Sequence, residues 1–140
     1  MTKMREATLL SADNWAEECN RLARTVRAHC LRMTHRGKSG HVGSMLSMAE
    51  ILCVLYKRIL RVDPKRPQWD GRDRFVLSKG HGGCAVYAVL GELGFFSKSW
   101  FGGYYRDKGK LMGHISHHVP GVEFSTGSLG HGLPVAVGLA

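Results

Sequence analysis

Apolar side chains recur every three or four positions between residues 14 and 34, which is the period of one face of an α-helix. Charged side chains lie mostly between them. Asn14, followed by Glu17 three residues later, resembles a capping box, and Gly37 is a typical helix stop. We therefore expect an amphipathic helix over residues 14–34. Its core-facing positions are Trp15, Cys19, Leu22, Val26, Cys30 and Met33.

A second amphipathic helix is expected over residues 47–60. Ser47 and Glu50 have the spacing of another capping box. The apolar face ends before an Asp-Pro pair, where the proline disfavours a helical residue ahead of it. The segment 63–74 is polar and contains two prolines and a glycine, so it is predicted to be a surface connection. The apolar face comprises Met48, Ile51, Leu52, Leu55, Ile59 and Leu60.

The next segment has the pattern of a strand, a tight turn and a helix. Residues 75–78 are short and mainly apolar, the glycine-rich stretch 79–83 follows, and residues 84–93 are apolar at nearly every position. In α/β folds, ligands bind where such turns leave the carboxyl ends of parallel strands. This placement makes His81, within the turn, a candidate site residue.

The remaining third of the chain ends on a glycine-rich turn. A short helix is predicted around residues 99–106, followed by a histidine-rich loop over residues 113–120. Beyond it, three glycines allow the backbone to turn sharply and to approach a ligand. A helix that begins near Leu133 or Pro134 would direct free N–H groups at an anion, so a phosphate-binding turn is predicted here. Its glycines are Gly127, Gly130 and Gly132.

Three histidines share one setting, because each directly follows a glycine on a separate predicted loop. They are His41, His81 and His114. A histidine in such a loop can donate a hydrogen bond to a phosphate or a sugar hydroxyl, or move a proton near neutral pH. Their shared context favours a functional role. Most of the other histidines are predicted to be packing or surface residues: His29, His35, His117, His118 and His131.

Composition limits the class of protein. With 140 residues and 44% hydrophobic content, the chain is long enough for one domain at most. No apolar stretch is long enough to span a bilayer and no signal-peptide core follows the N-terminus, so a cytoplasmic protein without a membrane partner is expected. The cysteines are spread along the chain, two of them at helix-core positions, which favours buried thiols over disulfides or a zinc site. They are Cys19, Cys30, Cys53 and Cys84.

The formal net charge of +9 fits nucleic acid, phosphorylated metabolites or an acidic partner chain. The basic residues are dispersed and lack a nucleic-acid-binding signature, so a solvated basic surface is the preferred interpretation, with no nucleic-acid partner. The histidines form no helical pair of the kind that zinc enzymes use, and no Gly-x-Ser-x-Gly elbow occurs. Neither a metal site within this chain nor a serine nucleophile is predicted.

Four ordered motifs resemble the N-terminal, pyrophosphate-binding part of transketolases. They are Ser39-Gly-His-Val-Gly-Ser44, Arg72-Asp-Arg-Phe-Val-Leu-Ser-Lys-Gly-His-Gly82, Gly113-His114 and Ser125-Thr-Gly-Ser-Leu-Gly-His-Gly132. The last motif, where full-length enzymes often have Pro-Leu-Gly-Gln-Gly, is more similar to the split type, whose N-terminal and C-terminal halves are separate polypeptides.

The resemblance implies roles for particular residues. Three match histidines that line the channel to thiamine diphosphate, where they contact the cofactor or the sugars and assist proton transfer: His41, His81 and His114. A second group matches positions that meet the cofactor: His81, Gly127, Ser128, Leu129 and Gly130. The implied reaction transfers a two-carbon ketol unit from a ketose phosphate to an aldose phosphate, and thiamine diphosphate carries the electronic work.

Part of the family pattern does not occur in residues 1–140. The Gly-Asp-Gly motif and a later asparagine, which hold a divalent ion (Mg²⁺ or Ca²⁺) on the diphosphate, are absent, and so is the glutamate of the pyrimidine-binding domain. We therefore expect an incomplete domain of the α/β class, the helix-rich N-terminal portion of a parallel-sheet, three-layer thiamine-diphosphate-binding fold. Companion transketolase chains would supply the missing parts in a dimer-based oligomer, and the chain would not be active alone.

Other functions stay open at this point. A 1-deoxyxylulose-5-phosphate synthase or another thiamine enzyme uses the same cofactor class, although the Arg72 to Gly82 motif fits transketolase better. A non-catalytic scaffold could retain this part of the fold without its chemistry. Replacement of His81 by alanine in the assembled complex separates the last alternative from an enzyme, since only an enzyme would lose turnover.

Overall fold

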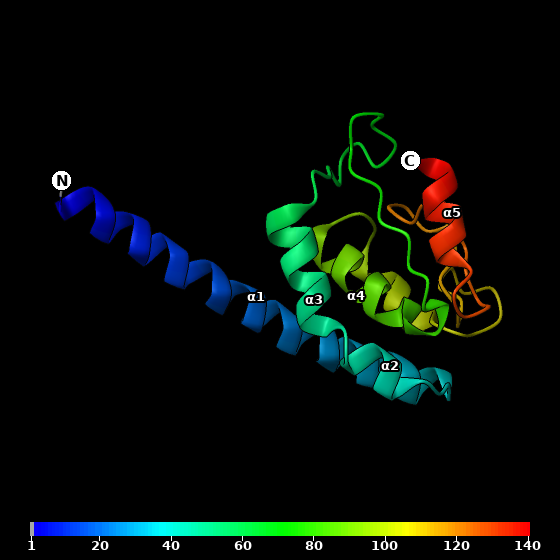
Figure 1. Ribbon diagram of the computed structural model, residues 1–140. Coiled ribbons are helices and arrows are strands. Elements are labelled where there is room, and N and C mark those ends of the chain that lie inside the picture. Colours follow the sequence, from blue (N-terminus) through cyan, green and yellow to red (C-terminus); the bar gives the residue numbers. More distant parts are fainter. Residues whose placement is uncertain (1) are drawn as a thin grey trace.

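The computed structural model describes the backbone of residues 2–140 and the side chains of residues 14–140. Helices dominate, and they are joined by long irregular segments (Figure 1). The elements in chain order are the α-helices α1 (Thr2–Gly37), α2 (Val42–Leu46) and α3 (Ala49–Val54), the π-helical turn η1 (Leu55–Ile59), the 3₁₀ turn η2 (Gly80–Gly82), α4 (Gly83–Leu93), the 3₁₀ segment η3 (Lys98–Gly103) and α5 (Gly132–Leu139).

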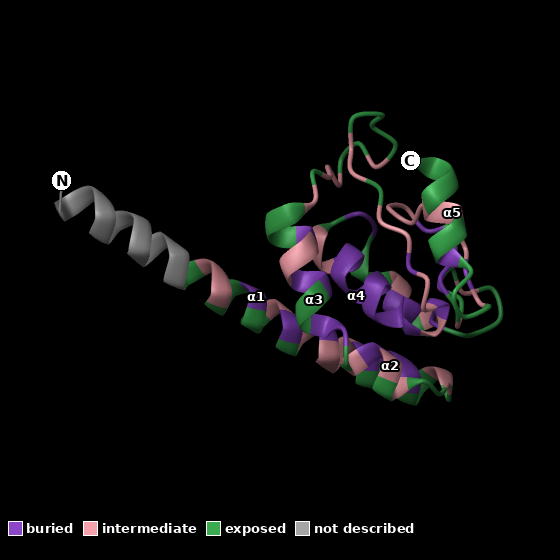
Figure 2. Cartoon of the chain, in the orientation of Figure 1, coloured by how far each residue is buried: buried purple, intermediate pink, exposed green. Residues whose placement is uncertain are grey.

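Helix α4 forms the centre of the fold, and it confirms the helix predicted over residues 84–93. It is apolar all round as far as Gly91, as expected for a helix enclosed by other elements. Each of its residues up to that glycine is buried, and α4 contacts α1, α2, α3 and both 3₁₀ segments. Figure 2 shows the helix buried along nearly its whole length. Gly94 ends it in the left-handed conformation, with φ 89°.

Helix α1 buries the predicted apolar stripe and ends at Gly37 as predicted. Cys19, Val26, Cys30 and Met33 are buried, and the helix contacts α3 and α4. The predicted start was wrong, because the helix begins at Thr2 and Asn14 lies inside it. No proline or glycine interrupts residues 2–36, so nothing in the backbone chemistry stops the helix at the capping pattern.

The helix predicted over residues 47–60 is divided into α3 and η1, and α2 precedes it. Ser47 is not an N-cap as predicted but the C-cap of α2. Its hydroxyl donates to the Ser44 carbonyl oxygen at 3.2 Å, and Met48 is the N-cap of α3 without any side-chain capping bond. The last turn widens into a π-turn, closed by a bond of 2.8 Å from the Leu60 N–H to the Leu55 carbonyl oxygen. The predicted apolar face is confirmed only in part: Met48 and Leu52 are buried, whereas Ile51 and Ile59 are 62% and 60% exposed.

The predicted strand over residues 75–78 is not a strand, and none occurs in residues 2–140. A strand requires a hydrogen-bonded partner strand, and no other segment of residues 2–140 pairs with this one. The α/β class is therefore not seen in this part of the chain, which is helix-rich. The polar connection 63–74 is irregular, as predicted.

A buried ion pair fixes the end of that connection. Arg72 donates from Nε and Nη2 to the two carboxylate oxygens of Glu123, at 2.9 and 2.8 Å. The side chains are only 9% and 14% exposed. Such a two-pronged pair is geometrically specific. It attaches the segment before residues 75–78 to the loop that leads into the glycine turn.

Three smaller expectations have mixed outcomes. The helix predicted around residues 99–106 is the shorter 3₁₀ segment η3, and the helix predicted from Leu133 or Pro134 is α5, which begins at Gly132. All four cysteines are buried and free, which agrees with the predicted buried thiols. Within the described helices, none is long and apolar enough to cross a membrane.

Candidate active site

The three histidines selected by their setting, His41, His81 and His114, come together from three separate loops. The ring centroids of His41 and His81 are 4.5 Å apart, those of His81 and His114 are 4.4 Å apart, and those of His41 and His114 are 6.1 Å apart. The two closer pairs meet nearly edge to face, at 71° and 79°. We call these three residues the histidine cluster. Residues 33 or more positions apart in sequence thus form one compact set of ring nitrogens.

His41 enters the cluster at the junction between α1 and α2. It is the N-cap of α2 and has a left-handed backbone, with φ 67° and ψ 22°. This conformation is uncommon and strained for residues other than glycine, and it is often kept at functional sites. A pocket of about 140 Å³ lies against His41 and His114, and its wall includes Lys38, Ser39 and Tyr105.

His81 is presented by η2, immediately before α4. Gly80 must be a glycine, because a Cβ there would lie 2.1 Å from the Thr126 carbonyl oxygen. The His81 Nδ1 atom is buried and has no hydrogen-bond partner in the described part of the chain. Buried polar atoms are nearly always paired in native proteins. This nitrogen is therefore the best-placed atom of the cluster to bind a ligand.

His114 is attached to both of its neighbours in the site. The adjacent Ile115 N–H donates to the Gly80 carbonyl oxygen at 3.1 Å, so the His114 loop is joined to the His81 turn. On its other side, a Cβ on Gly127 would lie 3.8 Å from the His114 ring. The first glycine of the predicted phosphate-binding turn therefore lies beside the histidine cluster.

The glycine turn is held on its inner side and open on its outer side. The buried Thr126 hydroxyl donates to the Leu77 carbonyl oxygen, and a Cβ on Gly132 would lie 2.6 Å from the Ser78 Cα. Gly130 has φ 86°, which favours glycine. Three predicted cofactor-binding residues form the exposed part of the turn: Ser128, Leu129 and Gly130.

The electrostatic setting keeps the His81 ring neutral near pH 7. Desolvation lowers the pKa of His81 below its ordinary value, and the like charges that His114 and His41 would carry lower it further. A neutral imidazole can donate from one nitrogen and accept at the other. No group of three His, Cys, Asp or Glu side chains within residues 14–140 is arranged to hold a metal ion.

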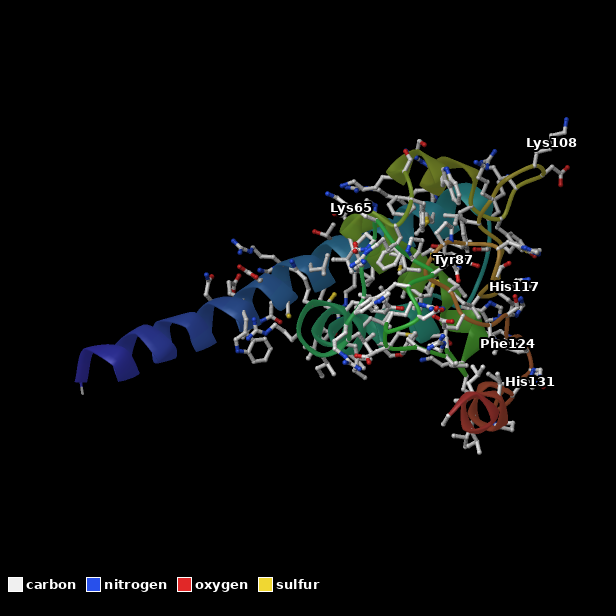
Figure 3. All side chains as sticks on the ribbon, turned by 90° about the horizontal axis from the view of Figure 1, so that it is seen from above. Lys65, Tyr87, Lys108, His117, Phe124 and His131 are labelled. Carbon is white, nitrogen blue, oxygen red and sulfur yellow. The ribbon has the colours of Figure 1, made fainter. Side chains whose placement is uncertain are left out.

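Other histidines have local partners instead. His29 Nε2 lies 2.7 Å from Glu92 Oε1. His117 donates its backbone N–H to the Ser125 hydroxyl at 2.9 Å, and its ring Nδ1 lies 2.7 Å from the same oxygen. Figure 3 shows His117, Phe124 and His131 along the side of the molecule that leads to α5.

Sequence reasoning missed the residues that hold the loops of the site through hydrogen bonds to their backbone. Thr126 fixes the glycine turn, and Tyr87 donates its hydroxyl proton to the His114 carbonyl oxygen at 2.7 Å. The sequence does contain a signal for Tyr87, because it is the only hydroxyl-bearing side chain in the apolar segment 83–93. A buried tyrosine usually finds a partner for its hydroxyl.

Comparison with known proteins agrees with this geometry. Residues 19–140 match the family model described as "Transketolase, thiamine diphosphate binding domain". The chain is 43% identical, over 126 residues, to an apulose-4-phosphate transketolase subunit of Actinobacillus succinogenes; the match covers 89% of this chain and 46% of that protein. It is 45% identical, over 102 residues, to a 6-deoxy-6-sulfo-D-fructose transketolase subunit of Clostridium sp. (strain MSTE9), covering 72% of this chain and 37% of that protein.

Solved structures give the same answer. Transketolase from Leishmania mexicana superposes with a TM-score of 0.82 at 36% identity, over 86% of this chain and 18% of that one. The chain thus spans less than half the length of the curated relatives described above. The match to the family model extends over most of the sequence and includes all three residues of the histidine cluster. The chain belongs to the transketolase family.

Proposed function

We propose that this chain supplies the diphosphate-binding wall of a transketolase, and that it acts in a complex with companion sequence. The reaction is the thiamine-diphosphate-dependent transfer of a two-carbon ketol unit from a ketose phosphate to an aldose phosphate. One observation carries the proposal: three histidines from separate loops meet beside a glycine turn that enters a helix. The family membership of the chain supports the choice of reaction.

The residues present fit the cofactor. The unpaired, buried Nδ1 of His81 requires a hydrogen-bonding ligand. The backbone of the turn from Gly127 to Gly130, with Ser128 and Leu129 between them, is accessible at the start of α5, where a helix favours an anion. These residues would hold the diphosphate side. When bound, thiamine diphosphate supplies the electron sink for the two-carbon unit.

The histidine cluster would act on the sugar. His41, His81 and His114 offer ring nitrogens that can bind hydroxyl groups and move a proton between them, since neutral imidazoles both donate and accept. The open pocket beside His41 and His114 gives a substrate access to two of the three rings. Their catalytic roles are part of the proposal.

The parts that this chain does not contain belong to the same proposal. The ligands of a divalent ion, Mg²⁺ or Ca²⁺, would come from companion sequence. The exposed apolar side chains of α5 support such a companion: Leu133, Val137 and Leu139 are 69%, 71% and 53% exposed. Two relatives are named as transketolase subunits. In the assembled enzyme, residues 75–78 would join a parallel sheet of the α/β class, and the oligomer would be built on a dimer.

The test is reconstitution. We would purify the chain alone and together with a polypeptide that carries the remaining parts of a transketolase. Thiamine diphosphate binding and ketol transfer between sugar phosphates would be measured for both preparations. The expected result is cofactor-dependent transfer only in the complex, lost in His81→Ala with assembly intact. Activity of the isolated chain would refute the need for a companion. A complex that uses pyruvate rather than a ketose donor would refute the reaction, and an unchanged rate in His81→Ala would support a scaffold.

A further inference from the structure

The peptide group between His114 and Ile115 is held at both of its polar atoms. Its carbonyl oxygen accepts a hydrogen bond from the Tyr87 hydroxyl at 2.7 Å, and its N–H donates to the Gly80 carbonyl oxygen at 3.1 Å. Gly80 directly precedes His81, so one peptide connects two loops of the histidine cluster. A peptide that is bonded at both ends cannot rotate freely, which restricts the direction of the adjoining His114 side chain.

Tyr87 is well suited to hold this peptide. Its side chain is completely buried and projects from α4, the most enclosed element of the fold; in Figure 3 it lies within the body of the molecule. Burial raises the pKa of Tyr87 well above its ordinary value, so the hydroxyl keeps its proton and remains a donor.

The first turn of α4 presses on the same peptide from another direction. A Cβ on Gly83 would lie 2.6 Å from the Ile115 nitrogen and 2.9 Å from its Cα. Gly83 therefore allows the peptide to approach the helix closely, and Tyr87, one turn later, bonds its oxygen. Residues 80–87 thus contact the His114–Ile115 peptide at its oxygen, at its nitrogen and at the adjoining Cα.

We propose that Tyr87 is a positioning residue of the histidine cluster, which acts through the His114–Ile115 peptide to hold the His114 ring against His81 and Gly127. The Tyr87 hydroxyl bonds the backbone oxygen of His114 and not its ring. Its effect is therefore on the position of the His114 ring relative to His81. The structural part of this inference stands on contacts within the chain, whereas its kinetic consequence rests on the proposed transketolase function.

The first experiment measures the geometry without relying on turnover. Tyr87→Phe removes the bond to the His114 oxygen and keeps the ring. In the assembled protein, with histidines isotope-labelled only in this chain, NMR would follow the titration of His81. We expect the pKa of His81 to rise toward its ordinary value. The His114 ring would move away, which would weaken the repulsion between the two charged rings and expose His81 to more solvent. Tyr56→Phe is the control: Tyr56 is also buried, and it packs on Phe75 away from the cluster.

The second experiment measures turnover and displaces the same peptide from its other side. We expect Tyr87→Phe to lower kcat for ketol transfer by roughly 10-fold, as small displacements of catalytic groups do, with little change in the KM for thiamine diphosphate. Gly83→Ala should have the same two effects with Tyr87 in place. Alanine is a better helix former than glycine, so a loss of α4 would not explain that result.

The outcomes separate the two proposals. If Tyr87→Phe and Gly83→Ala leave both the His81 titration and kcat at the level of Tyr56→Phe, Tyr87 is only a packing residue and the inference is wrong. If the wild-type complex has no ketol transfer at all, the proposed function fails, and the His81 titration still decides whether Tyr87 positions the cluster. Should Tyr87→Phe fail to fold, the His81 titration in Gly83→Ala still tests whether the His114–Ile115 peptide sets the position of the His114 ring, and an unchanged titration overturns the inference.

Discussion

Helices α4 and α5 are alike in composition and opposite in environment. Both are apolar along almost their whole length, and both follow a glycine turn that contributes to the candidate site. Residues 83–91 of α4 are all buried, whereas in α5 only Gly132 is buried and Val137 is 71% exposed. In Figure 3, α5 lies at an edge of the molecule with side chains directed away from it. An apolar helix therefore indicates that its surface must be buried against another element. Only the structure shows whether this part of the chain supplies that element.

The largest expected effect tests the buried half of this comparison. Leu90, in α4, is completely buried. Leu90→Ala removes apolar contacts and leaves a cavity, and we expect it to lower the free energy of unfolding by about 3 kcal/mol. Leu133→Ala, the matched change in α5, should lower it by less than about 0.5 kcal/mol in the isolated chain, because its side chain is 69% exposed.

Urea denaturation of both variants measures this difference. Equal losses would mean that α5 is packed in solution, and the contrast between the two helices would then disappear.

The next prediction concerns the ion pair that attaches the glycine-turn side of the molecule to the core side. Arg72→Met leaves the nearly buried carboxylate of Glu123 without its two-pronged partner. We expect a loss of about 2 kcal/mol in the free energy of unfolding, since a nearly buried carboxylate that has lost its hydrogen-bonded partner is costly. Arg74, whose Nε lies 3.9 Å from Glu123 Oε2, compensates this charge only in part. The control is Arg61→Met, whose Asp73 pair is exposed on the arginine side, at 73%; it should cost clearly less, because exposed ion pairs contribute little to stability.

Thermal denaturation monitored by circular dichroism suffices for this pair of variants. If the two have the same midpoint, Arg72 does not join the two regions more strongly than a surface pair would.

Hydrophobic periodicity predicted the uninterrupted helices, and it failed where a helix is broken or where its end is set by other residues. Residues 14–34, 84–93 and 133–139 are helical as predicted. The start of α1 was missed because a capping pattern also fits inside a helix. The π-turn at the end of residues 47–60 was missed because one turn with an i→i+5 bond changes the spacing too little to break the overall helical period, although it leaves Ile59 exposed. Residues 75–78 have the composition of a strand, yet composition cannot supply the partner strand.

For the candidate site, sequence reasoning selected histidines that the structure brings together, and it missed the residues that hold them in place. The glycine-histidine pattern selected His41, His81 and His114, and the structure places their rings together. Tyr87 and Thr126 act through bonds to residues 27 and 49 positions away. Partners at such separations leave no local pattern. The net charge of +9 discriminated least, because it fits several classes of partner.

A smaller effect is expected on the exposed side of the comparison. Val137→Asp places a charge on the open face of α5. It should leave the stability of the isolated chain almost unchanged and should weaken assembly with companion transketolase sequence at least 10-fold, or about 1.4 kcal/mol. Calorimetric titration of the two components gives both the affinity and the stoichiometry. Unchanged affinity would show that this face of α5 stays in contact with solvent in the enzyme.

The smallest expected effect is the pH dependence of stability that His81 contributes at the start of α4, in contrast to the start of α5. His81, just before α4, has a pKa below its ordinary value because of desolvation and the nearby rings of His114 and His41. The unfolded chain therefore binds the proton first. The contribution of His81 to stability is complete above pH 6.5 and is lost as the pH falls through the lower pKa of the folded state. Stability should accordingly decline below pH 6.5 with a slope of at most one proton from this group.

His81→Gln removes that group, so the curve of stability against pH should be flatter below pH 6.5 and should keep its form above about pH 7. Urea midpoints measured at half-unit steps of pH provide the comparison. A variant as steep as the wild type would assign the acid response to other groups, because a glutamine at position 81 cannot take up a proton in this range. The desolvated start of α4 would then no longer differ in acid response from the open start of α5.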